Sequence, residues 1–319
     1  MKYETIAAVL IIAAVLSALL TWRLIPLLRK HQAGQNIREE GPKAHMSKAG
    51  TPSMGGIAIV IAAAAAVVSI MYNDSDTVMI LTGFILFALI GFLDDYLKVI
   101  KKQNEGLKAW QKFGAQLIIA IALACWLAFL TDKGTDVYIP FADKYADFGI
   151  WYIPFIVFTI VAMVNAVNLT DGLDGLAAGT TGIVCAFMTI IAREALANTS
   201  TLFFAALLGA CIGFMIFNRH PAKIFMGDTG SLALGAGITM AAIVMKMELL
   251  LPLVGLIYVL EALSVCLQVG YFKATGGKRL FKMAPLHHHF ELSGMGETKV
   301  VVMFWIFTFL CCAVALAVA

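Results

Sequence analysis

The sequence predicts an all-α integral membrane protein with about ten transmembrane helices. Of its 319 residues, 61% are hydrophobic and 13% are charged, and the mean hydropathy is +0.89. That composition could not cover a soluble globule with polar surface. The apolar runs are continuous, whereas the strands of a membrane barrel would alternate apolar and polar residues. Spans of about 20 residues with short connections fill the chain, so we expect one polytopic domain over residues 1–319.

Each expected span is a run of apolar residues between polar or turn-forming residues. The ten runs lie near residues 5–22, 54–72, 77–93, 113–130, 150–167, 175–192, 201–217, 229–247, 249–271 and 300–318. In the ninth run, Pro252 and Gly255 predict a bend or a break. Glu261 in the same run should face protein rather than lipid. We expect Lys246 and Glu248, in the shortest turn, to lie at the membrane interface.

Lysine and arginine set the expected orientation. The connections at 23–53, 94–112, 168–174, 218–228 and 272–299 contain 18 of the 23 Lys and Arg residues. The positive-inside rule therefore places these connections in the cytoplasm and both termini outside it. The connection 168–174 has no positive charge, so its placement depends on the number of helices. A formal net charge of +3 is too small to indicate a nucleic-acid partner, and the lipid bilayer is the expected surrounding.

Acidic residues gather in the connections assigned to the cytoplasm. Asp94 and Asp95 end the third run, where adjacent carboxylates oppose each other and the helix dipole. We expect a cation beside them, either a divalent metal or one of Lys98, Lys101, Lys102 and Lys112. Asp171 and Asp174 lie three residues apart in the next such connection, and Asp228 precedes the eighth run. For Asp228, an ordinary helix cap is the alternative.

Basic and histidine-containing segments accompany these acids. Lys43 and Lys48 lie in a glycine-containing segment before the second run, where they suit a phosphate. The alternative is a basic segment attracted to anionic lipid. His287, His288 and His289 are adjacent, so they cannot easily all bind one ion from a regular helix. We favour contacts with phosphate or sugar and proton handling over a zinc site.

These groups together favour magnesium-dependent phosphoryl transfer. Carboxylates without matching soft ligands suit Mg²⁺, and Mg²⁺, lysines and main-chain amides neutralise a pyrophosphate. The sequence has no nucleophile elbow, Rossmann fingerprint or Walker A motif. A site at the membrane edge suggests one soluble and one lipid substrate. The alternative from another class is a proton- or cation-coupled transporter, which would need acids distributed through the membrane depth.

Five segments in chain order resemble the bacterial phospho-N-acetylmuramoyl-pentapeptide transferases, a branch of the polyprenyl-phosphate N-acetylhexosamine-1-phosphate transferases. They are Lys48–Gly56, Asp94-Asp95, Asn168–Gly175, Phe225–Ser231 and Pro285–Glu291. Any one of these motifs is weak, but five in register are specific. The triple histidine points to the muramoyl branch, and a sister transferase that uses another UDP-N-acetylhexosamine is the closer alternative.

The resemblance implies a reaction and its participants. Phospho-N-acetylmuramoyl-pentapeptide would pass from UDP-N-acetylmuramoyl-pentapeptide to undecaprenyl phosphate in the bacterial cytoplasmic membrane, giving UMP and the first lipid-linked peptidoglycan precursor. Asp228 would be the Mg²⁺ ligand, with Asp94 and Asp95 beside the reacting phosphates. The positions that match the uridine site are Lys48, Gly172, Leu173, Asp174, Asn218 and Phe225. The remaining candidates are Asn168, Asp171, His287 and His288 for substrate binding and His289 for catalysis. Since the family dimerises, a homodimer is expected.

Two chemical routes stay open. The lipid phosphate could attack the sugar-linked phosphorus directly, or an aspartate could first form a phospho-enzyme. We favour direct attack because the second ionisation of such a phosphate lies near about pH 6, so it is already largely dianionic at neutral pH. Adjacent Asp94 and Asp95 facing an incoming anion would be poor nucleophiles without strong cationic help.

Overall fold

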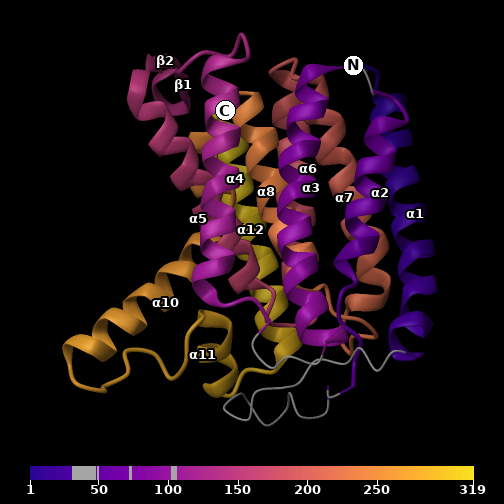
Figure 1. The fold of residues 1–319 in the computed structure, drawn as a ribbon, viewed down its shortest axis with the longest axis vertical. Coiled ribbons are helices and arrows are strands. Elements are labelled where there is room, and N and C mark those ends of the chain that lie inside the picture. Colours follow the sequence, from indigo (N-terminus) through magenta and orange to yellow (C-terminus); the bar gives the residue numbers. More distant parts are fainter. Residues whose placement is uncertain (31–47, 49, 72–73, 102–105) are drawn as a thin grey trace.

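The protein is a bundle of long helices with both chain termini at the same end (Figure 1). The computed structural model describes residues 1–30, 48, 50–71, 74–101 and 106–319, so Lys43 and Lys102 lie outside the described residues. The helices are α1 (Tyr3–Lys30), α2 (Gly56–Val68), α3 (Ser75–Asp95), α4 (Ala109–Phe129), α5 (Tyr152–Thr170), α6 (Leu176–Glu194), α7 (Asn198–Asn218), α8 (Gly227–Val244), α9 (Leu251–Val254), α10 (Leu256–Ala274), α11 (Leu286–Leu292) and α12 (Glu297–Val318). Strands β1 (Asp136–Ile139) and β2 (Lys144–Asp147) form an antiparallel hairpin between α4 and α5.

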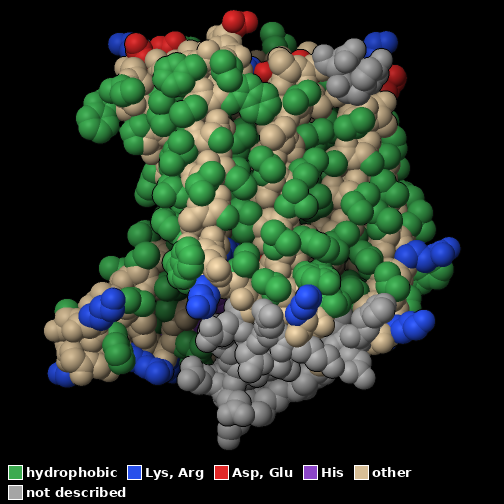
Figure 2. Space-filling view, in the orientation of Figure 1, with side chains coloured by type: hydrophobic (Ala, Val, Ile, Leu, Met, Phe, Trp, Pro, Cys, Tyr) green, Lys and Arg blue, Asp and Glu red, His purple; other side chains and the backbone are tan. Residues whose placement is uncertain are grey.

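Nine helices of the described part of the chain are long and apolar enough to cross a membrane. Figure 2 shows hydrophobic side chains over the wall of the bundle, while Asp and Glu side chains on this face gather at the end that holds the termini. An apolar wall between two polar ends is what a bilayer requires. The prediction of an all-α, multi-pass membrane protein is therefore confirmed.

The expected span at 54–72 is shorter than predicted. Helix α2 has 13 residues, which at about 1.5 Å per residue is roughly 20 Å, less than the hydrocarbon core of about 30 Å. The segment before it is not helical, because its main chain pairs with another connection: Phe225 N–H donates to Pro52 O at 2.8 Å, and Gly55 N–H donates to Phe225 O at 2.9 Å. Tertiary hydrogen bonding thus accounts for the later start of the helix, at Gly56; the helix also ends earlier than expected, at Val68.

The predicted break in the ninth run is confirmed. The short helix α9 ends at Val254, and α10 begins at Leu256 on the other side of Gly255. Beyond this break α10 turns away from the bundle (Figure 1), and only 22% of its most apolar window is buried inside the protein. Most of α10 therefore faces its surroundings rather than other helices.

Glu248, expected in a turn at the membrane interface, is enclosed by protein in that turn. Its side chain is buried, with 1% exposure, and among the described residues neither carboxylate oxygen has a hydrogen-bond partner. The reason is the hairpin: β1 packs against the turn Glu248–Leu250. Lys246 Nζ fastens the hairpin by donating to the carbonyl oxygens of Gly134 at 3.1 Å and Asp136 at 2.9 Å.

Helix α8 is the centre of the bundle. Of its most apolar window, 89% is buried, and it packs along α3 and α5. It runs from the end of the bundle where α11 lies toward the end that holds the termini (Figure 1). The first residues of α8 and the last residues of α3 and α5 therefore meet at one end of the bundle.

Candidate active site

Asp95 binds the N-terminus of α8 from the end of α3. Its Oδ1 accepts a hydrogen bond from Asp228 N–H at 3.0 Å, and its Oδ2 accepts from Thr229 N–H at 2.8 Å and from Thr229 Oγ1 at 2.6 Å. The first amides of a helix have no partner within the helix, and a carboxylate at that positive end satisfies them. Asp95 thereby holds the start of α8 in place.

Asp94 and Asp228 share two lysines. Lys98 Nζ lies 2.8 Å from Asp94 Oδ2 and 3.0 Å from Asp228 Oδ2. Lys112 Nζ, from α4, lies 2.8 Å from Asp228 Oδ2 and 3.4 Å from Asp94 Oδ2. Leu107 N–H also donates to Asp94 Oδ1 at 2.7 Å. Two of the cations expected beside the aspartate pair are thus present, and they bridge two acids that are far apart in sequence.

Asn168 completes the surroundings of Asp228 from the end of α5. Its Nδ2 donates to Asp228 Oδ1 at 2.8 Å and to Ser231 Oγ at 2.7 Å. Each oxygen of Asp228 therefore has a different kind of partner: Oδ1 faces an amide and Oδ2 faces two ammonium groups. Groups from the segment just after α3, from α4 and from α5 converge on this one carboxylate at the start of α8.

Asp171 and Asp174 separate from each other. Asp171 follows α5 and lies near the aspartates described above: burial, together with the charges of Asp228 and Asp95, raises its pKa to about 7. Asp174 is buried, and its Oδ1 lies 2.7 Å from Lys48 Nζ. The predicted pair thus divides between two clusters, one at the start of α8 and one around Lys48.

The cluster around Lys48 contains two residues that were not predicted, Glu297 and His220. Glu297 Oε1 accepts from Lys48 Nζ at 2.5 Å and from Asp174 N–H at 2.8 Å. His220 Nδ1 lies 3.0 Å from Asp174 Oδ2 and 3.3 Å from Glu297 Oε2. Glu297 begins α12, where an acid is an ordinary favourable residue at the positive end of a helix. Sequence alone therefore offered no signal for its contact with Lys48.

Asn218 ties this cluster to the connection that leads into α8. Gly175 N–H donates to Asn218 Oδ1 at 3.1 Å, and Asn218 Nδ2 donates to the carbonyl oxygen of Ile224 at 2.9 Å. Leu173, in the loop between α5 and α6, is buried, and Phe225, in the connection before α8, is half-buried. The predicted uridine-site residues therefore come from three connections, which are joined by Lys48 with Asp174 and by Asn218 with Gly175.

The three histidines have three different partners. His287 is buried, and its Nδ1 lies 2.7 Å from Glu261 Oε2. His288 Nδ1 lies 3.2 Å from Glu291 Oε2, while His289 Nδ1 accepts from Lys282 N–H at 3.2 Å. The structure therefore does not direct their Nδ1 atoms to a common point.

The acids at the start of α8 fit a divalent cation by their chemistry. Asp94 and Asp228 offer hard carboxylate oxygens, which are the donor class that Mg²⁺ prefers. A second group, Asp174, His220 and Glu297, brings its ligand atoms within 4.8 Å of one another. Lysines contact the carboxylates of both clusters, but the second group includes a histidine nitrogen, whereas the acids at α8 offer only oxygens, the ligands that Mg²⁺ prefers.

Comparison with known proteins identifies the class of the chain. The family model described as glycosyl transferase family 4 matches residues 77–246, a range that includes Asp94, Asp95 and Asp228. The first signature of phospho-N-acetylmuramoyl-pentapeptide-transferase matches residues 48–60, beginning at Lys48. A helical bundle with an apolar wall and charged clusters at one end, together with these matches, defines a membrane transferase.

Curated relatives narrow the class further. Phospho-N-acetylmuramoyl-pentapeptide-transferases of Heliobacterium modesticaldum and Clostridium perfringens are each 48% identical to this chain, over 92% and 98% of both chains respectively. That of Alkaliphilus oremlandii is 46% identical over 99% of this chain and 98% of its own. The chain belongs to the phospho-N-acetylmuramoyl-pentapeptide-transferase family. The predicted resemblance is confirmed, and membership favours a transferase over the transporter alternative.

Proposed function

We propose that the protein transfers phospho-N-acetylmuramoyl-pentapeptide from its UDP-linked donor to undecaprenyl phosphate and releases UMP. One observation carries the proposal: two acids and two lysines meet at the start of α8, with Asp94 and Asp228 both in contact with Lys98 and Lys112. Phosphoryl transfer depends mainly on positioning and neutralisation of charge, which this cluster offers. The names of the relatives support the same reaction.

Asp228 is the proposed Mg²⁺ ligand. When bound, Mg²⁺ would neutralise charge on the phosphate oxygens. Lys98 and Lys112 would then be free to turn from the carboxylates toward the phosphates. Asp94 lies beside them, while Asp95 holds the first turn of α8 through three hydrogen bonds. Asp95 thus acts mainly on the position of Asp228.

The proposed nucleotide site is the second cluster. Lys48 and Asn218, with Gly172, Leu173, Asp174 and Phe225, would bind the uridine moiety of the donor. Lys48 offers an ammonium group next to a buried carboxylate, an arrangement that orients the lysine. Asn168, Asp171, His287 and His288 complete the proposed substrate contacts, and His289 stays a catalytic candidate.

Direct attack by the lipid phosphate is the favoured route. Asp94 does have cationic help, because Lys98 and Lys112 contact its carboxylate, so its charge no longer argues against a phospho-enzyme. Direct attack is still favoured because the acceptor, a phosphate monoester, is largely dianionic at neutral pH and needs little help from a base. A labelled phospho-aspartate trapped without lipid acceptor would contradict it.

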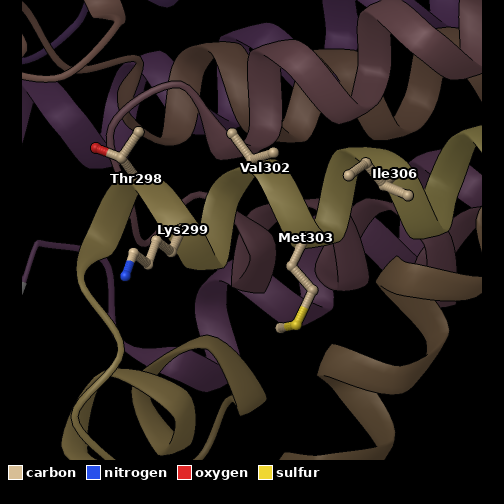
Figure 3. Close-up of a pocket in the computed structure, with 5 residues that line it drawn as sticks. All are labelled: Thr298, Lys299, Val302, Met303 and Ile306. Carbon is tan, nitrogen blue, oxygen red and sulfur yellow. The ribbon is translucent and has the colours of Figure 1, made fainter.

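An apolar pocket near the N-terminal end of α12 suits the lipid acceptor. Figure 3 shows Val302, Met303 and Ile306 along one helix, with Lys299 and Thr298 at its start. The pocket has a volume of about 420 Å³, and Lys299 lies two residues from Glu297. An isoprenoid chain could occupy such an apolar surface with its phosphate near the lysine. We place the protein in the bacterial cytoplasmic membrane, with this end of the bundle in the cytoplasm, as a homodimer.

The test is UMP release by the purified protein in detergent. We expect release from UDP-N-acetylmuramoyl-pentapeptide that requires both Mg²⁺ and undecaprenyl phosphate. Chelation of the metal should abolish it, and re-addition of Mg²⁺ should restore it. Folded protein that releases no UMP would contradict the proposal. Release from UDP-N-acetylglucosamine instead would identify a sister transferase.

A further inference from the structure

Glu261 in α10 is fully buried and binds His287 of α11 through both carboxylate oxygens. Oε1 accepts a hydrogen bond from His287 N–H at 3.1 Å, and Oε2 lies 2.7 Å from His287 Nδ1. An ionisable residue within an apolar span is costly and calls for a partner inside the protein. The partner here is a single histidine, which is held at two points.

This contact determines which ring nitrogen of His287 carries hydrogen. An ionised carboxylate only accepts hydrogen bonds, so Nδ1 must be the donor to Glu261. The other nitrogen, Nε2, is buried and has no hydrogen-bond partner among the described residues. A hydrogen on Nε2 would be a buried donor without an acceptor, which costs more than a bare lone pair. The geometry therefore places hydrogen on Nδ1 and leaves Nε2 as a free acceptor.

The Nε2 edge of the ring lies against Gly172. A β-carbon at Gly172 would fall 2.1 Å from Nε2 and 2.7 Å from Cε1 of His287, so only glycine permits this approach. Gly172 belongs to the loop 171–175 between α5 and α6, and the next residues in it are Leu173 and Asp174. The imidazole thus supports the loop that carries part of the proposed nucleotide site.

We propose that Glu261 is a positioning residue: it fixes the tautomer and orientation of His287, whose Nε2 edge in turn sets the position of the loop 171–175. The inference rests on the proposed function only in assigning nucleotide binding to that loop. Glu261, an acid within the apolar span α10, thereby acts on this loop through His287 of α11. It also couples α10 and α11 to the connection between α5 and α6.

The tautomer can be tested by substituting Glu261→Gln. An amide has one oxygen, so with that oxygen on His287 N–H its NH₂ group faces Nδ1, which must then accept. The hydrogen would move to Nε2, against Gly172. We expect ¹⁵N spectra of histidine-labelled protein to show hydrogen on Nδ1 of His287 in the wild type and on Nε2 in the variant, with the signal assigned by its loss in His287→Asn. Wild-type hydrogen on Nε2 would overturn the inference.

The positioning role can be tested by hydrogen exchange of the loop amides. In Glu261→Gln, exchange in residues 171–175 should be about tenfold faster, with exchange in α8 unchanged as a sign of intact folding. His287→Asn, which keeps a donor toward Glu261 but lacks the Nε2 edge, should show the same. Glu248→Gln is the matched control, because it changes another buried acid at the other end of the bundle. Unchanged loop exchange in Glu261→Gln would overturn the inference.

UMP binding separates this inference from the proposed function. By calorimetry, Glu261→Gln should bind UMP about tenfold more weakly than the wild type, and Glu248→Gln should bind it equally well. Wild-type protein that binds no UMP would contradict the proposed nucleotide site, while the spectra and the exchange rates would still decide the role of Glu261. Equal UMP affinity in the wild type and Glu261→Gln would overturn the link between the histidine and the nucleotide.

Discussion

At the scale of single residues, the charges of the candidate site are almost fully paired within the protein. Asp228 Oδ2 contacts two lysines, and Asp174 contacts Lys48 and His220. Buried carboxylates need such partners, because an unpaired charge in a low-dielectric interior is very costly. A substrate phosphate or a metal must therefore compete for groups that already have partners, which makes each of these residues sensitive to substitution.

Asp228→Asn should reduce UMP release about 100-fold or more without unfolding the protein. The amide keeps the size of the side chain but removes the charge that pairs with Lys98 and Lys112 and that would bind Mg²⁺. Turnover and thermal unfolding in detergent would be measured on the same sample. Asp76→Asn, which breaks the pair with Lys133 near the start of α3, is the control and should stay active. A tenth of normal turnover in Asp228→Asn would argue against the metal role.

Glu297→Gln should weaken nucleotide binding more than it slows turnover. The variant loses the charge that pairs with Lys48 and one of the two acceptors used by Asp174 N–H and His220. A charge-assisted hydrogen bond is worth about 1.5–3 kcal/mol, so the KM for the donor should rise about tenfold or more. We expect kcat to change by less than about threefold. A loss confined to kcat would place Glu297 in the chemistry rather than in binding.

At the scale of elements, close helix packing places the site. Helices α3 and α8 lie close together beside Asp228, where a β-carbon at Gly91 would lie 2.1 Å from the carbonyl oxygen of Asp228. Small residues allow such contact between membrane helices. Both helices could be located from the sequence, but their contact at Gly91 could not, since the periodicity of one helix contains no information about its partner.

Gly91→Ala should therefore destabilise the protein and displace Asp228. Overpacking of this kind costs about 1–3 kcal/mol, and UMP release should fall together with the unfolding temperature. Gly114→Ala in α4 is the matched control, because nothing lies within 4 Å of its β-carbon position. There, alanine should be neutral or stabilise the helix by up to about 1 kcal/mol. Equal unfolding temperatures for the two variants would show that α3 and α8 do not meet at Gly91.

At the scale of the whole molecule, the two ends of the bundle differ in what they contain. One end holds the proposed site, and the other holds both termini and the hairpin β1–β2 (Figure 1). Helix α8 connects the two, with Asp228 at its start and Lys246 and Glu248 just beyond its end. Stability and orientation can be tested at the second end without touching the site.

The stability of the protein should fall as pH rises, in part because of Glu248. Burial raises the pKa of Glu248 from 4.5 to about 7. Between these values the unfolded chain has lost the proton and the folded protein keeps it, so stability decreases with pH. The contribution amounts to about 3 kcal/mol at most, present below pH 4.5 and lost above about pH 7. Thermal unfolding from pH 5 to 8 should show a smaller decline for Glu248→Gln, and parallel curves would contradict this account.

Both termini should lie outside the cytoplasm. The positive-inside rule gives this orientation, and the structure places the two termini at the same end of the bundle (Figure 1). Alkaline phosphatase fused to the C-terminus should be active in cells, whereas a fluorescent protein that matures only in the cytoplasm should stay dark there. The opposite pair of results would place the proposed site outside the cytoplasm, away from any nucleotide donor.

Sequence by itself determined the membrane class, nearly all of the helices, the break at Gly255 and the family. Hydropathy is a local property: about 20 consecutive apolar residues cross a bilayer whatever their neighbours are. The motifs also named Asp94, Asp228 and Asp174 correctly as residues that gather at one end of the bundle. The later start of α2 was missed because it depends on contacts with a distant connection. The hairpin, whose strands pair locally, was not predicted either.

Tertiary structure alone decided which of these groups meet. Lys48 contacts Glu297 across 249 positions of sequence, and Lys112 contacts Asp228 across 116. It also separated Asp171 from Asp174, buried Glu248 and joined Glu261 to His287. The physical reason is that a charge within or beside the membrane needs a partner, but any suitable partner on a neighbouring helix satisfies it. Only the packing of the helices determines which one is close enough.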